Sequence, residues 1–278
     1  MRADHVLVTG ASSGIGEALA LALAGPGRVL HLAGRHAGRL DGVADACAAR
    51  GAIAQARVID VGDEDAMAAW IGGAGPLDLV LACAGISGGT AASASPGGSS
   101  AGGQPGPAPI GTEPSEQVGR IMRVNLAGVI NTVLPAIAVM RDQPRAEHGW
   151  RGRIAAISSV AAFVSSPTAP SYCASKAAVD RWMVGSAAGW RPHGIVLSSV
   201  CCGFVRSRMT EANDFRMPGL MDADRAAQLI LRGVARNQRR IVFPGWMGMA
   251  SRMLDLLPPR WSEAILQRQG GKAPLKDD

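Results

Sequence analysis

Short apolar runs and helical stretches alternate along the chain, and this alternation constrains the fold more than any other feature. In the first part of the chain the apolar runs predict strands at residues 5–9, 28–33, 54–60 and 77–82, and helical patterns lie between them at 16–23, 40–50 and 64–71. Strands joined by single helices require right-handed crossovers, which place helices on both faces of a parallel sheet. We therefore predict an α/β fold, a doubly wound parallel sheet in a three-layer α/β/α arrangement.

A low-complexity stretch rich in Gly, Ser and Pro, residues 87–112, interrupts this pattern. Because the alternation resumes after it, we predict a flexible surface loop inside one domain rather than a linker between two. Further helices are expected at 115–140, 171–190 and 224–237, and further strands at 153–158, 194–200 and 240–243. This predicts one domain at 1–245, followed by a C-terminal helical extension and tail at 246–278.

The composition argues against several classes of function. The formal net charge is +6, but the arginines are scattered, whereas a nucleic-acid site needs a clustered basic patch. Attraction to an anionic cofactor is the simpler explanation. The five cysteines form no CxxC motif and no secretory signal precedes them, so we expect a reducing cytoplasm. The five histidines lack metal-ligand spacing, and we expect no metal.

No apolar run in the sequence reaches the ~18 residues that a membrane-spanning helix needs. The stretch from Trp246 to Leu257 is rich in Met and Leu but includes Arg252 and Asp255. We expect it to form a packed helix or a cover over an apolar substrate site. Peripheral contact with a membrane surface is the less favoured alternative.

The first strand ends in a glycine-rich turn, Thr9-Gly-Ala-Ser-Ser-Gly-Ile-Gly16, which runs into a helix. Gly10 permits a tight turn, Gly14 lets the backbone approach a pyrophosphate, and Gly16 lets helix and strand pack closely. The N–H groups and positive dipole end of the helix then face the phosphates. An ordinary turn is the alternative, but a strand before and a helix after are the context of a Rossmann-type dinucleotide site. The expected contacts are Gly10, Ser12, Ser13, Gly14, Ile15 and Gly16.

The residues after the second strand indicate which dinucleotide is bound. An acidic side chain there would bind a ribose 2′-hydroxyl, whereas an arginine accepts a 2′-phosphate. The chain has Arg35 and no acid at this point, which favours NADP(H) over NAD(H), unless Arg35 is only a solvated loop charge. Asp60 and Val61, after the third strand, are placed to contact adenine.

The chain contains one tyrosine, Tyr172, and Lys176 follows it by four residues. On a helix these side chains share a face. The ammonium would favour the phenolate and lower the tyrosine pKa from about 10, so that the phenol could exchange a proton near neutral pH. An ordinary surface pair is the alternative.

Several further motifs occur in a characteristic order. They are Cys83-Ala-Gly85, Val124-Asn-Leu126, Ile157-Ser-Ser159, Tyr172-Cys-Ala-Ser-Lys176 and Gly203-Phe-Val-Arg-Ser207. With the glycine turn, they make the chain resemble the short-chain dehydrogenase/reductase family over residues 5–245. Ser159 lies 13 positions before Tyr172, as the family's catalytic serine does, so we choose it over Ser158, which would point to the other face.

The resemblance implies four catalytic residues. Tyr172 would be the general acid in reduction and the general base in oxidation, and Lys176 would lower its pKa and hold the nicotinamide ribose. Ser159 would hydrogen-bond the substrate oxygen. Asn125 would sit at a helix irregularity and organise a water for proton relay. The remaining implied cofactor contacts are Cys83, Ala84, Gly85, Gly203, Val205 and Ser207.

The chain departs from the family pattern at three of these positions. Cys83 replaces the usual Asn and, as a weak hydrogen-bonding group, would hold its loop less firmly. Cys202 replaces the usual Pro, which would loosen the backbone beside the nicotinamide. Ser207 replaces Thr and should keep the hydroxyl contact. These changes put the efficiency and the cofactor affinity in question without removing the catalytic set.

The sequence thus predicts an NADP(H)-dependent oxidoreductase acting on a carbonyl/alcohol pair. The mobile lid that the family places after Gly203 includes Met209, Phe215, Met217, Leu220 and Met221, which favours an apolar substrate unless these residues are ordinary packing. An epimerase or dehydratase is disfavoured because its usual Gly-x-x-Gly-x-x-Gly turn is absent. A non-catalytic cofactor-binding or regulatory protein is the alternative. By analogy with the family, we expect a homodimer or homotetramer.

Overall fold

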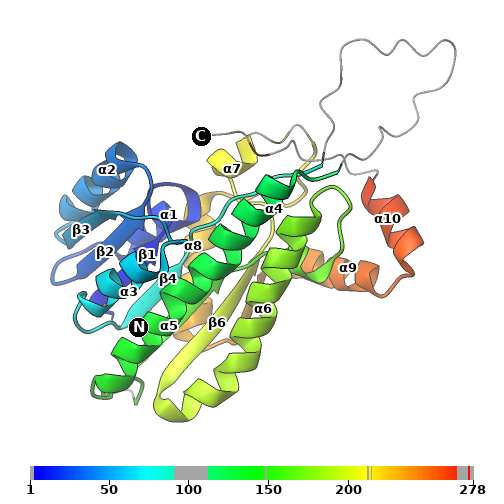
Figure 1. Cartoon of the computed structure of the whole chain (residues 1–278). Helices are drawn as coiled ribbons and strands as arrows, with labels where there is room; N and C mark the ends of the chain where they lie inside the picture. Colours follow the sequence, from blue (N-terminus) through cyan, green and yellow to red (C-terminus); the bar gives the residue numbers. More distant parts are fainter. Residues whose placement is uncertain are drawn as a thin grey trace, which may run out of the picture.

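The computed structural model describes residues 3–90, 112–147, 149–211, 213, 215–267 and 275, which form a seven-stranded parallel sheet. The strands are β1 (His5–Thr9), β2 (Val29–Gly34), β3 (Ile53–Val58), β4 (Leu79–Ala82), β5 (Gly152–Ile157), β6 (Ile195–Cys202) and β7 (Arg240–Phe243). Their order across the sheet is β3-β2-β1-β4-β5-β6-β7 (Figure 1). The predicted doubly wound α/β fold is therefore confirmed.

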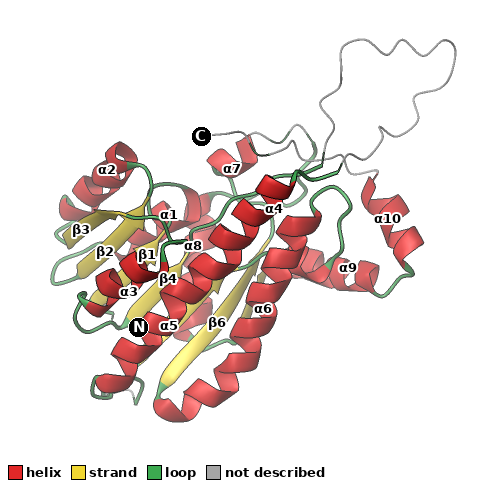
Figure 2. Ribbon diagram, in the orientation of Figure 1, coloured by secondary structure: helices red, strands yellow, loops and turns green. Residues whose placement is uncertain are grey.

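Helices cover both faces of this sheet (Figure 2). One layer contains α1 (Gly14–Leu23), α2 (Ala37–Ala48) and α8 (Ala223–Ala235), and the other contains α3 (Glu64–Gly72), α4 (Ser115–Met122), α5 (Gly128–Asp142) and α6 (Pro170–Trp190). Each layer encloses its own apolar core. Val8 and Leu81 belong to the first core and Leu7 and Val80 to the second, because successive side chains of a strand point to opposite faces.

The chain reverses its direction across the sheet between β3 and β4. The first three strands proceed outward from β1, and the next four proceed outward from β4 on the other side. The carboxyl ends of β1 and β4 therefore lie side by side at the centre of the sheet. In doubly wound folds this is the place where the loops diverge and leave a crevice for a ligand.

The predicted elements are all present, but some of their ends differ. The strand expected from residue 77 begins at Leu79, because the N–H and C=O of Leu77 bond the Gln143 side chain at 3.0 and 2.8 Å. The helix expected at 115–140 is divided. Between α4 and α5 it widens into a π-helical turn, Arg123–Ala127, which contains Asn125 at the irregularity that the family resemblance implied.

This divided helix also corrects the expectation that no segment is long and apolar enough to span a membrane. Residues 115–142 meet that criterion by length and composition, with a mean hydropathy of 1.5 over the best window. However, 50% of the window is buried inside the protein, and α5 packs against α3 and the sheet. A core helix that is half buried can meet the same criterion of length and composition, so the criterion alone is weak evidence for a membrane span.

Two helices follow β7, namely α9 (Gly245–Asp255) and α10 (Pro259–Gln267). The packed helix predicted from Trp246 to Leu257 corresponds to α9. Three short helices, η2 (Val160–Phe163), η3 (Arg191–His193) and α7 (Arg208–Glu211), complete the described elements. Residues 91–111 of the predicted surface loop lie outside the described residues, and the division at residue 245 stays a prediction.

A buried ion pair ties α6 to the last two strands. The Asp180 carboxylate accepts hydrogen bonds from the Arg240 guanidinium at 2.9 and 2.7 Å, from Ser199 Oγ at 2.7 Å and from Cys201 Sγ at 3.3 Å. Burial alone would raise the pKa of Asp180, but the hydrogen bonds from Arg240, Ser199 and Cys201 outweigh it and lower the pKa. The carboxylate is therefore the stable form in the folded chain.

We predict that Asp180→Ala lowers the free energy of unfolding by about 2–4 kcal/mol at pH 7, because the substitution leaves its buried donors without an acceptor. The matched control is Asp142→Ala, whose exposed side chain lies 3.5 Å from Arg141 and should matter by less than about 0.5 kcal/mol. Urea unfolding of both variants measures the difference.

The loss of unfolding free energy caused by Asp180→Ala should become smaller as the pH falls. The folded-state pKa of Asp180 is lower than its value in the unfolded chain, so its stabilisation is complete above the unfolded value of about 3.9 and disappears as the pH falls through the folded value. The difference between wild type and Asp180→Ala should therefore shrink in acid. A difference that grows in acid would contradict this assignment.

Candidate active site

A cavity of about 730 Å³ lies at the carboxyl ends of the strands. Its walls come from the loops that follow β1 to β6, from the start of α6, and from α9 and α10. The predicted cofactor contacts, together with Ser159, Tyr172 and Lys176, all line this cavity. Of the predicted catalytic and cofactor-binding residues, only Asn125 does not line it.

The glycine turn after β1 forms one end of the cavity, and it has no room for side chains. A Cβ on Gly10, whose φ is +65°, would lie 2.7 Å from the Cα and N of Ala84, and a Cβ on Gly16 would lie 2.2 Å from the carbonyl oxygen of Gly10. Ser13 caps α1 without using its side chain to bond the helix. The hydroxyl of Ser13 and the helix N–H groups therefore face the cavity as potential anion ligands.

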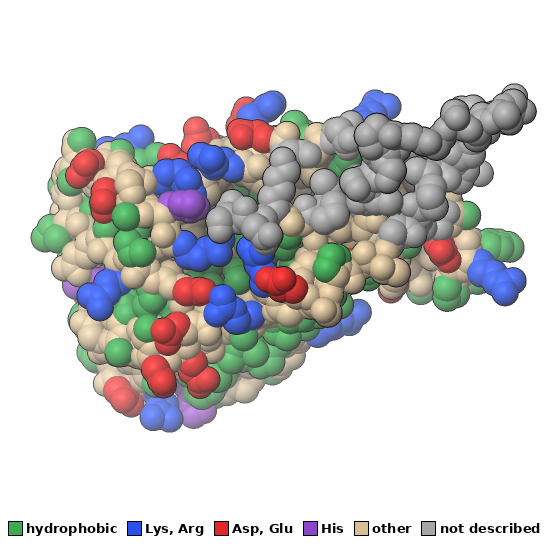
Figure 3. Space-filling model, turned by 45° about the horizontal axis from the view of Figure 1, so that its top comes forward, with side chains coloured by type: hydrophobic (Ala, Val, Ile, Leu, Met, Phe, Trp, Pro, Cys, Tyr) green, Lys and Arg blue, Asp and Glu red, His purple; other side chains and the backbone are tan. Residues whose placement is uncertain are grey.

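Basic side chains lie beside this turn. Arg35 and Arg39 line the cavity together with His36, from the end of β2 and the start of α2. Figure 3 shows Lys and Arg side chains in blue grouped near a histidine in purple on this face of the protein. Arg39 Nε is buried and makes no hydrogen bond within the described residues. The sequence reasoning missed Arg39, although its position four residues after Arg35 on a helical pattern was a usable signal.

Asp60 and Val61 also line the cavity, but each has a structural partner as well. Asp60 accepts hydrogen bonds from the Gly62 N–H and the Arg123 guanidinium, both at 2.9 Å. Val61 packs against Gly128, where an added Cβ would lie 2.5 Å from Val61 Cγ2. The loop after β3 is thereby held against the helix that contains the π-helical turn.

The loop after β4 is held by its backbone, so the replacement of the usual Asn by Cys83 does not leave it without contacts. The Cys83 and Ala84 N–H groups lie 3.2 and 3.5 Å from the Thr9 hydroxyl. The Asn125 amide accepts from the Ile86 N–H at 2.8 Å and donates to the Ile86 C=O at 3.0 Å. Asn125 thus supports the cavity wall from behind, and its implied role in a water relay stays a prediction.

The catalytic candidates meet at the end of β5. Ser159 hydrogen-bonds the Tyr172 hydroxyl and donates to the Cys202 carbonyl at 3.3 Å. Lys176 Nζ donates to the Ile157 carbonyl at 2.9 Å and lies 5.8 Å from the centre of the Tyr172 ring. Ser158 differs from Ser159, because its hydroxyl donates to the backbone carbonyl of Lys176 at 2.8 Å and holds α6 against the strand. Both serines line the cavity, and the choice of Ser159 as the catalytic serine stays a prediction.

The pKa of Tyr172 is raised, whereas the sequence predicted that Lys176 would lower it. Burial raises the pKa of the phenol, the neighbouring thiol of Cys202 raises it further, and only the hydrogen bond with Ser159 lowers it among the main influences. The Lys176 ammonium lies on the expected face but does not reverse the effect of burial. Tyr172 is therefore a protonated phenol across the neutral pH range, which is the form of a proton donor.

Burial keeps the thiols in and near the cavity protonated. Burial raises the pKa of Cys83 and of Cys202, although the nearby Lys176 opposes the increase in both. Burial and the neighbouring Asp180 raise the pKa of Cys201 to about 12. These thiols stay protonated near neutral pH. They are therefore unreactive, because the thiolate is the reactive form of cysteine. Among the described residues, no three His, Cys, Asp or Glu side chains lie close enough together to hold a metal ion.

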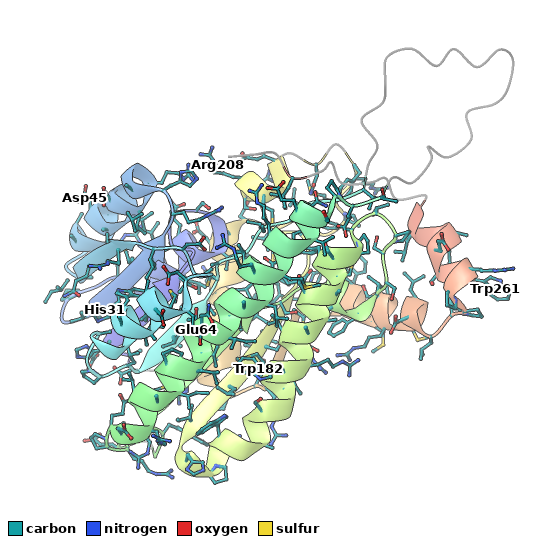
Figure 4. All side chains as sticks on the ribbon, in the orientation of Figure 1. His31, Asp45, Glu64, Trp182, Arg208 and Trp261 are labelled. Carbon is teal, nitrogen blue, oxygen red and sulfur yellow. The ribbon has the colours of Figure 1, made fainter. Side chains whose placement is uncertain are left out.

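The other half of the cavity is largely apolar. Phe204 and Phe215 pack edge to face with ring centres 6.0 Å apart, and both line the cavity. Met209 also lines it, as predicted for the lid, whereas Met217, Leu220 and Met221 do not. Figure 4 shows Arg208 on α7 at the top of the view, so a charged side chain borders this apolar region.

Comparisons with known proteins give a consistent result. A model of the short chain dehydrogenase family matches residues 4–216. An uncharacterised oxidoreductase from Myxococcus xanthus is 32% identical over 266 residues, which cover 94% of this chain and 96% of that protein. The crystal structure of a short-chain type dehydrogenase/reductase from Mycobacterium marinum superposes with a TM-score of 0.71 and 27% sequence identity. The match covers 88% of this chain and 95% of the Mycobacterium marinum chain. A short-chain dehydrogenase from Sphingobium yanoikuyae, solved in complex with NADPH, shares the fold with a TM-score of 0.72 and 20% identity over 92% of this chain and 96% of its own.

We predict that Gly10→Ala destabilises the protein by about 2–4 kcal/mol, because it combines a left-handed backbone with a clash against the Ala84 backbone. The matched control is Gly42→Ala in the middle of α2, where an added Cβ meets no atom within 4 Å. That change should stabilise the protein by about 0.5–1 kcal/mol. Urea unfolding measures both values, and changes of the same sign would contradict the proposed packing of the turn.

Proposed function

Because this chain belongs to the short-chain dehydrogenase family, we propose that it uses NADP(H) to interconvert an apolar carbonyl compound and the corresponding alcohol. The observation that carries this proposal is the arrangement of Ser159, Tyr172 and Lys176 in the same cavity as the glycine turn. One end of the cavity suits a dinucleotide, and the other end is apolar. The reacting groups lie between these ends. Assembly into a homodimer or homotetramer remains a proposal by analogy.

The residues at the glycine turn fit a dinucleotide. A Cβ on Gly10 or Gly16 would meet backbone and a Cβ on Gly14 would meet the Ser207 side chain, so all three positions require glycine, and they lie next to the positive end of α1. A pyrophosphate can approach such a surface closely and accept hydrogen bonds from its N–H groups. Asp60 and Val61 would border the adenine.

The preference for NADP(H) rests on the two arginines beside this turn. Arg35 and Arg39 line the cavity where the adenosine ribose would lie, and no acidic residue occupies that position to bond a 2′-hydroxyl. The orphaned Nε of Arg39 is a donor that a phosphate oxygen would satisfy. The Sphingobium dehydrogenase of the same fold binds NADPH in its own structure.

The side chains near Tyr172 supply the proton and orient the substrate. When bound, the nicotinamide supplies the hydride. Tyr172, a protonated phenol at neutral pH, donates its proton to the carbonyl oxygen of the substrate during reduction. Ser159 orients the Tyr172 hydroxyl and can bond the same oxygen as charge develops on it. The Lys176 ammonium stabilises the phenolate that remains after the proton has left.

In the direction of alcohol oxidation, Tyr172 must first lose its proton. Since burial raises the pKa of this residue, the phenolate is rare at neutral pH. Oxidation should therefore accelerate as the pH increases, whereas reduction should proceed readily at neutral pH. We propose that reduction is the favoured direction near pH 7.

We predict that Tyr172→Phe lowers kcat for carbonyl reduction at least ~100-fold, because the substitution removes the proton donor and keeps the ring. NADPH should still bind, because Phe keeps the packing of the cavity wall. Single-turnover kinetics and a fluorescence titration with NADPH measure the two quantities. Retained turnover would contradict the proton-transfer role, and binding of NADPH by a wild type that turns over no carbonyl compound would favour the non-catalytic alternative.

We predict that Arg35→Asp weakens NADPH binding by at least ~10-fold and leaves NADH binding almost unchanged, because it places a like charge beside the 2′-phosphate. The matched control is Arg57→Asp. Arg57 lies on the neighbouring strand β3 and does not line the cavity, so this variant has the same net charge but should keep the preference for NADPH. Equal losses in both variants would assign the effect to overall charge.

A further inference from the structure

The wall of the cavity farthest from the glycine turn is built by α9 and α10, which lie beyond the residues that match the family. The lining side chains from these helices are Trp246, Met247, Ala250, Ser251, Leu254 and Leu266. Only Ser251 among them is polar. Residues 247, 250, 251 and 254 share one face of α9, since their spacing follows the helical repeat. On this face Met247, Ala250 and Leu254 form an apolar row about 10 Å long, with Ser251 beside it.

This row begins next to the catalytic residues. A Cβ on Gly203 would lie 3.0 Å from Met247 Sδ, so Met247 packs directly on the backbone after β6. The preceding residue, Cys202, accepts the hydrogen bond from Ser159. Ala250 and Leu254 follow Met247 at about one and two turns along α9, so they continue the row away from the contact with Gly203.

Tight packing holds α9 in place behind the row. A Cβ on Gly248 would lie 2.4 Å from Val242 Cγ1, so the helix rests directly on β7. The Arg252 guanidinium lies over the Phe163 ring, 4.4 Å from its centre, and joins the helix to η2. The row is therefore a preformed surface, which binds an apolar group with little ordering cost.

We propose, building on the proposed function, that this row binds an unbranched alkyl chain attached to the reacting carbonyl, and that Ala250 and Leu254 limit the chain length. Each methylene that leaves water for an apolar surface favours binding. The far end of the row meets Leu254 and the buried Leu266, which offer no hydrogen bond. A substrate with a second polar group at that end would lose its hydration without compensation, whereas an alkyl chain has no such group.

The opposite face of the same helix provides a matched control. Met249 and Met253 are 62% and 59% exposed and do not line the cavity. On α10, Trp261 is also exposed, and Figure 4 shows it projecting away from the rest of the molecule. Substitutions on these outer faces change apolar bulk without reaching the row.

The test compares wild type, Ala250→Leu, Leu254→Trp and the control Met253→Trp with NADPH and straight-chain methyl ketones from 2-butanone to 2-dodecanone. In wild type, kcat/KM should rise about three- to fourfold per methylene and then level off. It should level off at a shorter chain in Leu254→Trp and at the shortest in Ala250→Leu, which lies nearer the catalytic residues. Met253→Trp, whose side chain does not line the cavity, should follow wild type with every ketone from 2-butanone to 2-dodecanone.

Calorimetric titration of the same ketones separates this inference from the proposed function. Tighter binding of longer ketones without turnover would keep the alkyl site and reject the oxidoreductase proposal. Turnover of 2-butanone with no dependence on chain length would reject the alkyl site and keep the oxidoreductase. Equal losses in Leu254→Trp and Met253→Trp would also overturn the inference. Ala250→Leu, at an exposed position, serves as the second variant if Leu254→Trp does not fold.

Discussion

The close contact between the turn after β1 and the loop after β4 is the constraint on which the rest of the site depends. Gly10 touches the backbone of Ala84, Gly16 touches Gly10, and the Thr9 hydroxyl bonds the neighbouring N–H groups. Two segments that lie more than 70 residues apart in the sequence therefore meet backbone to backbone. Because no side chain separates them, the two segments can shift little relative to each other. The width of the cavity between the helix end and the catalytic residues follows from this contact.

The second organising element is α6, which joins the chemistry to the core. Tyr172, Lys176 and Asp180 follow one another at intervals of four residues and therefore share a face of the helix. Each contacts a different structure: the serine after β5, the end of β5 itself, and the arginine of β7. These contacts fix the rotation of the helix about its axis. The buried carboxylate thus helps to hold the phenol at its place in the cavity from two turns away.

Local pattern predicted much of the fold and of the site, and contacts distant in sequence account for what it missed. The strand–helix alternation and the glycine turn depend on neighbouring residues, so the sequence was sufficient for them. The late start of β4 depends on Gln143, 66 positions after Leu77. The raised pKa of Tyr172 depends on burial and on Cys202, neither of which the spacing to Lys176 reveals. Arg39 belongs to no recognised motif, and only its unpaired nitrogen in the structure draws attention to it.

The single tyrosine of this chain lies in its candidate active site, with a consequence for spectroscopy. Any ultraviolet signal of phenolate formation in the folded protein arises from Tyr172 alone, because the sequence contains no other phenol. The protein therefore carries a built-in optical reporter of one protonation state. Titrating that signal with and without ligands would follow the environment of one hydroxyl group without labels or substitutions.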